Sequence, residues 1–151
     1  MRLPLPRVTA VVLTALASWS CKGDATGPED DACEINTTTV YVAGGVMFDW
    51  SPGCAVAVLR VQDEAGGDMW VVYSPEIEVG TTQRSNRIIP RVTYGIVPAG
   101  TGSPRTPVPM VAGGNYKLTL WRAYAAGSLP GSCPPNVENL CLVALQPFAR
   151  P

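Results

Sequence analysis

Short runs in which apolar and polar residues alternate recur along residues 36–148. In residues 46–50, for example, the alternation puts Val46, Phe48 and Trp50 on one face. A period of two residues is typical of a β-strand with one buried face. The pattern predicts about seven strands, at residues 37–42, 46–50, 55–62, 68–74, 91–97, 115–123 and 141–147.

Glycine and proline, 15 of each, mark the connections between these runs. Residues 63–67 read Asp-Glu-Ala-Gly-Gly, which predicts a hairpin because glycine adopts a positive φ at little cost. Residues 98–109 are too rich in proline and glycine to form a regular element. The only convincing helical segment lies in the first 20 residues. The remainder is therefore expected to form an all-β domain, an antiparallel β-sandwich.

The first 20 residues have the pattern of an export signal. Arg2 and Arg7 precede an apolar run at residues 8–17, which is too short to span a bilayer because a spanning helix needs about 20 apolar residues. An Ala-Leu-Ala motif predicts cleavage before Ser18. Alternatively, Ser-Trp-Ser-Cys resembles a bacterial lipobox with Ser18 in the usual Leu position, which predicts cleavage before Cys21 and acylation of its thiol.

The number of cysteines favours lipidation of Cys21. The chain has five cysteines, and exported proteins tend to pair them, so one is left over. The residues that follow Cys21 are polar and acidic, as expected of a flexible tether. We therefore expect a signal peptide at 1–20, a lipidated cysteine and tether at 21–34, and a β-sandwich domain at 35–151.

Acylation of Cys21 predicts a protein of the bacterial cell envelope, with a lipid bilayer as its partner through the acyl chains. Lys22 and Gly23 do not match the aspartate-type signal for retention in the inner membrane, so we expect the outer membrane. Cleavage before Ser18 would instead give a soluble secreted protein.

Residues 110–120, Met-Val-Ala-Gly-Gly-Asn-Tyr-Lys-Leu-Thr-Leu, resemble the L-x-x-G-x-x-Y-x-V-x-V stretch of fibronectin type III domains. In such sandwiches the tyrosine, here Tyr116, forms a corner in which its hydroxyl bonds to upstream backbone. Residues 48–52 resemble the early strand of that family, whose buried tryptophan precedes a proline-containing turn. The chain is also similar to small bacterial surface lipoproteins with one fibronectin- or Ig-like domain. The resemblance implies a seven-stranded sandwich; the proline-rich loop and the cysteines depart from the family.

Strands that alternate in direction in this order bring the four remaining cysteines to one pole of the sandwich. We expect local pairing, Cys33 with Cys54 and Cys133 with Cys141. The two other connectivities stay open, because all four cysteines share that pole.

The candidate binding residues lie in and beside the loop that the second disulfide would close. Fibronectin-like domains often use this loop for recognition, and here it contains Pro134, Pro135 and Asn136. A disulfide and two prolines pre-order the loop and lower the entropy cost of binding. Trp121 is out of phase with the leucines of its strand, so we expect an exposed ring that stacks on a sugar or fills a partner's pocket. Plain stabilisation of the loop, and a cover over Trp121, are the competing interpretations.

The composition argues against catalysis and nucleic-acid binding. The chain has no histidine, the commonest general base and metal ligand, and no phosphate-binding or nucleophile motif. Charged residues make up 15% of the chain and form no basic patch. We therefore expect neither an enzyme nor a bound cofactor or metal.

Two groups of acidic residues are candidate sites, one for glycoside hydrolysis and one for calcium binding. Glu76 and Glu78 would share a face of a strand, and paired carboxylates at the right separation hydrolyse glycosides. Asp63, Glu64 and Asp68 flank the glycine turn and offer oxygen ligands, but their spacing matches no calcium loop. A solvated surface is the simpler interpretation of both groupings.

Together these features predict a membrane-anchored envelope lipoprotein that acts as a non-enzymatic binding or structural module, with another protein or a glycan as its further partner. The alternatives are a carbohydrate-binding or accessory domain of a secreted glycan-processing system, and a soluble secreted protein.

Overall fold

A computed structural model describes residues 33–76, 83–134, 136 and 138–151. The predictions for the signal peptide, for Cys21 and for the tether up to residue 32 lie outside these residues, as do Glu78 and Pro135.

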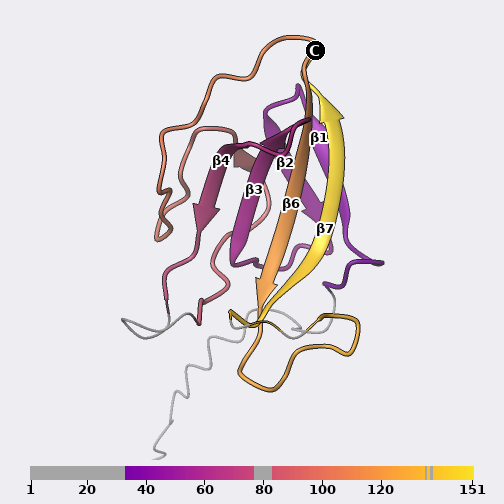
Figure 1. Ribbon diagram of the computed structural model, residues 1–151, viewed down its shortest axis with the longest axis vertical. Coiled ribbons are helices and arrows are strands. Elements are labelled where there is room, and N and C mark those ends of the chain that lie inside the picture. The colour runs from indigo at the N-terminus through magenta and orange to yellow at the C-terminus, as the bar shows by residue number, and fades with distance from the viewer. Residues whose placement is uncertain (1–32, 77–82, 135, 137) are drawn as a thin grey trace, which may run out of the picture.

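The described chain forms two antiparallel sheets and no helix (Figure 1). The three-stranded sheet has the order β1 (Thr39–Ala43), β2 (Met47–Ser51), β5 (Val92–Thr93). The four-stranded sheet has the order β4-β3-β6-β7, and lies in front of β1 and β2 in Figure 1. Its strands are β3 (Val58–Asp63), β4 (Asp68–Tyr73), β6 (Asn115–Ala123) and β7 (Leu140–Ala149). The predicted all-β sandwich is confirmed, and the architecture is compatible with an Ig- or fibronectin-like domain.

The main core lies between the two sheets and follows the predicted alternation. Phe48 and Trp50 point inward from β2 and are 0% and 2% exposed. Leu59 and Val61 on β3 face them from the other sheet. Alternate residues of the neighbouring strands β4 and β6 point into the same core: Trp70, Val72, Leu118 and Leu120. The indole N–H of Trp50 donates to the carbonyl of Cys54 at 2.8 Å, so this large ring is buried without losing its hydrogen bond.

One predicted strand, residues 91–97, is much shorter in the structure. Only Val92 and Thr93 pair with β2, because the backbone turns on either side of them. Arg91 and Gly95 have φ angles of 71° and 80°, outside the β region, and the N–H of Ile96 bonds back to the carbonyl of Thr93.

Other strand boundaries also moved. The strand predicted at 55–62 begins at Val58, since Val56 instead makes an isolated bridge to Ile88. The last strand extends to Ala149 and includes Pro147. This is possible because β7 is an edge strand, where a residue without an N–H leaves no partner unsatisfied.

The proline-rich segment 98–109 covers the free edge of β4. Gly102 and Tyr73 exchange two backbone hydrogen bonds, at 2.8 and 2.9 Å, and the N–H of Val108 donates to the carbonyl of Met69. The hydroxyl of Tyr94 donates to the carbonyl of Val108 at 2.6 Å and holds the segment from the other side. Burial raises the pKa of Tyr94 to about 12. An edge paired in this way is not open to another chain.

The structure contains the tyrosine corner that the resemblance implied. The hydroxyl of Tyr116, which is 7% exposed, accepts a hydrogen bond from the N–H of Val111 at 2.7 Å. A Cβ on Gly114 would lie 2.6 Å from this hydroxyl, so only glycine leaves room for it. The contact pins the loop before β6 onto the strand itself.

Both expected disulfides are present, Cys33–Cys54 and Cys133–Cys141, with Cα separations of 6.1 and 5.6 Å. The register pairs Val58 with Trp121, and Ala123 with Leu140. The start of β3, the end of β6 and the start of β7 therefore meet at one pole. In Figure 1 the loop between β6 and β7 and the beginning of the described chain both lie at this lower end.

We predict that Tyr116→Phe lowers the free energy of unfolding by about 1 kcal/mol, because the N–H of Val111 loses a partly buried acceptor. Urea denaturation measures the change. The matched control is Tyr41→Phe, since Tyr41 is 57% exposed on the other sheet. Equal stability of the two variants would show that the corner contributes nothing.

Candidate functional site

The strand register places an aromatic row on the outer face of the four-stranded sheet. Val58 lies opposite Tyr73 on one side and opposite Trp121 on the other, and Trp121 lies opposite Leu142. These residues alternate with the core residues of their strands, so they point away from the other sheet. The next row contains Val71, Arg60, Thr119 and Leu145, and the row after it Asp68, Gln62, Lys117 and Pro147. The face therefore changes from aromatic at the disulfide pole to polar toward the opposite pole.

Trp121 is on the outer face, as its phase predicts, and is half-buried rather than open. It packs beside Val58, which is only 2% exposed, in a small second hydrophobic cluster with Val71, Ala123 and Leu140. The indole N–H donates to the hydroxyl of Thr119 at 3.2 Å. This bond satisfies the only polar group of the ring and fixes its orientation on the strand.

Tyr73 is the second aromatic residue of the row and is also half-buried. The guanidinium carbon of Arg84 lies 4.5 Å from the centre of its ring. The Nη1 atom of Arg84 donates to the carbonyl of Ser74 at 3.1 Å, which holds the cation over the ring. Tyr73 is thus held by a cation that is itself anchored to the backbone.

The loop that the second disulfide closes is organised by Asn136. The side-chain amide of Asn136 donates to the carbonyls of Leu140 and Pro134, at 2.7 and 3.1 Å, and its oxygen accepts from the N–H of Leu140 at 2.9 Å. The amide therefore shapes the loop, and its polar atoms already have partners inside the loop.

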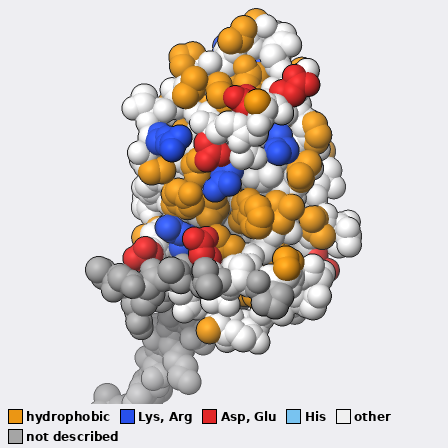
Figure 2. Space-filling model, in the orientation of Figure 1, with side chains coloured by type: hydrophobic (Ala, Val, Ile, Leu, Met, Phe, Trp, Pro, Cys, Tyr) orange, Lys and Arg blue, Asp and Glu red, His pale blue; other side chains and the backbone are white. Residues whose placement is uncertain are grey.

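The loop and the aromatic row together form a groove, which we call the outer groove. It has a volume of about 430 Å³ and is lined by Val58, Arg60, Tyr73, Trp121, Pro134, Asn136, Glu138 and Leu140. Three of the four residues that the sequence singled out, Trp121, Pro134 and Asn136, thus lie around one cavity. In Figure 2, which looks onto the four-stranded sheet, hydrophobic side chains form a band across this face with charged side chains beside it.

Sequence reasoning missed Tyr73, Arg60 and Glu138. Tyr73 and Arg60 have the outward parity on their strands, which the sequence shows. Which outward residues become neighbours depends on the register between strands that are far apart in the chain, and no pattern in the sequence gives that register.

Two charged residues of opposite sign line the outer groove. The Nε of Arg60 lies 3.6 Å from a carboxylate oxygen of Asp68, which is an ion pair but too long for a hydrogen bond. The Arg60 side chain is 34% exposed, and Glu138 is exposed on the loop. The groove thus offers the guanidinium as a hydrogen-bond donor and the carboxylate as an acceptor.

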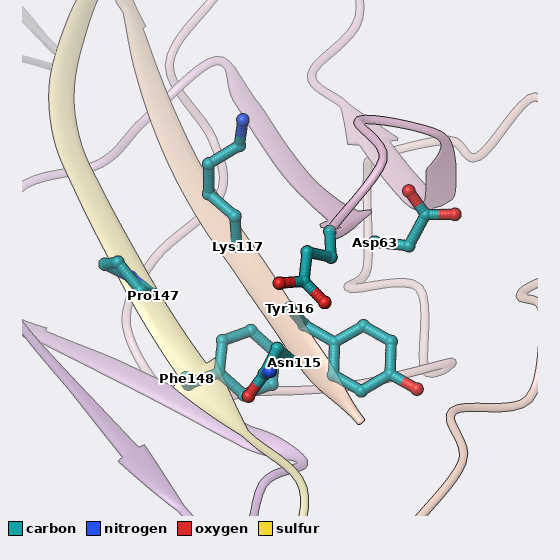
Figure 3. Close-up of a pocket in the computed structure, with 7 residues that line it drawn as sticks. Asp63, Asn115, Tyr116, Lys117, Pro147 and Phe148 are labelled. Carbon is teal, nitrogen blue, oxygen red and sulfur yellow. The ribbon is translucent and has the colours of Figure 1, made fainter. Parts of the chain in front are cut away.

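A second hollow of about 400 Å³ lies at the opposite pole, beside the hairpin between β3 and β4. Figure 3 shows Lys117 and Tyr116 leaving β6 in different directions, with Asp63 across the hollow. A carboxylate oxygen of Asp63 accepts from the N–H of Gly67 at 2.6 Å, and Asp68 accepts from the side chain of Gln62 at 3.1 Å. These acidic residues hold the hairpin together. Across the described residues, no three potential metal ligands gather at one place.

Comparison with known proteins found no matching family model, no matching curated protein and no matching solved structure. In the part of the chain that the structure describes, no helix is long and apolar enough to cross a membrane. The assignment of a site therefore depends on the geometry of the outer groove.

We predict that replacing Cys133 and Cys141 together by serine loosens the wall of the outer groove. The bond closes a separation of 8 residues, so its loss is expected to cost about 2–3 kcal/mol of stability. Acrylamide quenching of tryptophan fluorescence should increase, because a looser loop exposes more of Trp121, which is half-buried. Trp50 and Trp70 are 2% and 1% exposed in the main core, so they contribute little to the change. Replacing Cys33 and Cys54 is the control, since that bond does not border the groove. An equal increase in both variants would contradict the prediction.

Proposed function

We propose that this protein is a lipid-anchored binding module of a bacterial envelope, and that the outer groove is its recognition surface. The observation that carries the proposal is the meeting of Trp121 with the stapled loop of Pro134 and Asn136 around one cavity. A strand and a loop that are separate in the sequence combine there into an aromatic, partly polar surface, which is the usual composition of a ligand site.

The disulfides support the anchor at Cys21. The two bonds use four of the five cysteines, so Cys21 has no cysteine left to pair with inside the chain. A cysteine that follows an export signal and has no partner is a natural acylation site. We place the protein at the outer membrane, since the two residues after Cys21 give no inner-membrane signal.

The position of the anchor relative to the groove suits a binding role. The described chain begins at Cys33, at the pole that also carries the stapled loop. A tether of 11 residues between Cys21 and Cys33 can span at most about 40 Å. That length allows the domain to change its orientation relative to the membrane, so that the outer groove can face away from the bilayer.

A binding role fits the lining of the outer groove better than catalysis does. Among the described residues that line the groove, Glu138 is the only carboxylate, and none is a serine, threonine or cysteine. Acid–base hydrolysis of a glycoside needs two carboxylates on opposite sides of the bond. We also propose that the fold is a variant of the fibronectin type III or Ig-like sandwich, supported by the tyrosine corner at Tyr116.

The anchor is tested by mass spectrometry of the mature N-terminus together with membrane fractionation. We expect an acylated N-terminal Cys21 and recovery in the membrane fraction, and loss of both in Cys21→Ser. Ser18→Leu is the matched control, because it restores the usual lipobox residue and should preserve acylation. An unmodified N-terminus at Ser18 would contradict the anchor.

The groove is tested by immobilising the protein and exposing it to solubilised envelope material. We expect Trp121→Ala to retain at least fivefold less material than the wild type, since it removes the largest side chain of the outer groove. Tyr41→Ala is the control, because Tyr41 is an exposed aromatic residue on the other sheet. Equal retention by Trp121→Ala and the wild type would rule out the groove as the recognition surface.

A further inference from the structure

The two aromatic rings of the outer groove lie on the flat face of a sheet, at a defined spacing. Tyr73 and Trp121 flank Val58 in the same row, so they are two strand spacings apart, about 9–10 Å. Both come from regular strands, and each is held by a contact of its own, with Arg84 and Thr119 respectively. A ligand therefore meets a firm surface, with a ring at either side of a low apolar floor.

The strand backbone beneath the groove is already paired. Strands β3 and β6 have paired neighbours on both sides, and the outer edge of β4 is bonded to Gly102 and Val108. A peptide cannot be added here as a further strand, which is a common mode of peptide recognition. On the floor of the groove, recognition therefore depends on side chains.

The polar side chains of the groove favour an uncharged ligand rich in hydroxyls. Arg60 only donates hydrogen bonds, and Glu138 in its ionised form only accepts them. An anion would be repelled by Glu138 and would meet an Arg60 that is already paired with Asp68. A cation would be attracted by Glu138 but repelled by Arg60. A hydroxyl group both donates and accepts, so it suits both residues.

We propose that the outer groove binds a neutral oligosaccharide, with the apolar face of one sugar ring on Trp121 and hydroxyl groups bonded to Arg60 and Glu138. The indole N–H is already used by Thr119, so Trp121 meets the sugar through its carbon atoms. The stapled loop forms a wall before the ligand arrives, which reduces the entropy lost on binding. This inference depends on the proposed function, because it names the ligand class of the same groove.

The test uses three neutral hexasaccharides, cellohexaose, maltohexaose and hexa-N-acetylchitohexaose, with the full mature chain carrying Cys21→Ser so that no detergent is needed. Isothermal titration calorimetry should show saturable binding of at least one of them. We expect the affinity for that sugar to fall at least tenfold in Trp121→Ala and at least threefold in Arg60→Gln. Tyr41→Ala should bind as the parent chain does. Trp121→Phe keeps an aromatic face and should lose less than Trp121→Ala, which gives a second measurement if the alanine variant does not fold.

Several results would overturn the inference: no saturable binding of any hexasaccharide, binding that is unchanged in both Trp121 variants, or stronger binding of a decaproline peptide. Decaproline is included because aromatic grooves also accept polyproline helices. If the hexasaccharides fail while retention of envelope material still depends on Trp121, the inference is wrong and the proposed function stands. If the hexasaccharides fail and Trp121→Ala also retains as much envelope material as the wild type, the outer groove is not the recognition surface either.

Discussion

The pairing of β3 with β6 is the contact on which the rest of this structure depends. It places Leu59 opposite Leu120 on the core face, and Val58 opposite Trp121 on the outer face. A slip of one residue would turn the residues of the core face toward solvent and those of the outer face toward the core, because side chains alternate along a strand. The same register therefore determines both the packing between the sheets and the aromatic row outside them.

The two edges of the four-stranded sheet are protected in different ways, and both involve proline. On β4 the proline-rich segment runs alongside the strand and pairs with it at Tyr73 and Met69. On β7 the edge strand contains Pro147, which has no N–H to offer. Protection of both edges limits pairing with another chain, and the outer groove lies on the face between them.

Tertiary structure also divides the roles of the candidate residues. Trp121 contributes carbon surface, while the amide of Asn136 is used to shape the loop between the disulfide-bonded cysteines. Arg60 and Glu138 add the hydrogen-bonding groups of the groove. The candidate site thus combines an aromatic surface with two charged side chains among its described lining residues.

The sequence alone predicted the class of fold, most of the strands and the hairpin at residues 63–67, because alternation and turn chemistry are local properties. The resemblance to fibronectin type III domains implied the tyrosine corner, and both expected disulfides, chosen among three connectivities, are present. The sequence also predicted that Trp121 points outward. Local signals failed at residues 91–97, where backbone turns at Arg91 and Gly95 end the pairing early. The cover over the β4 edge and the gathering of Tyr73, Arg60 and Glu138 around Trp121 were decided only in three dimensions. Each depends on contacts between segments that are distant in the chain, and their register is fixed by burial of the whole core.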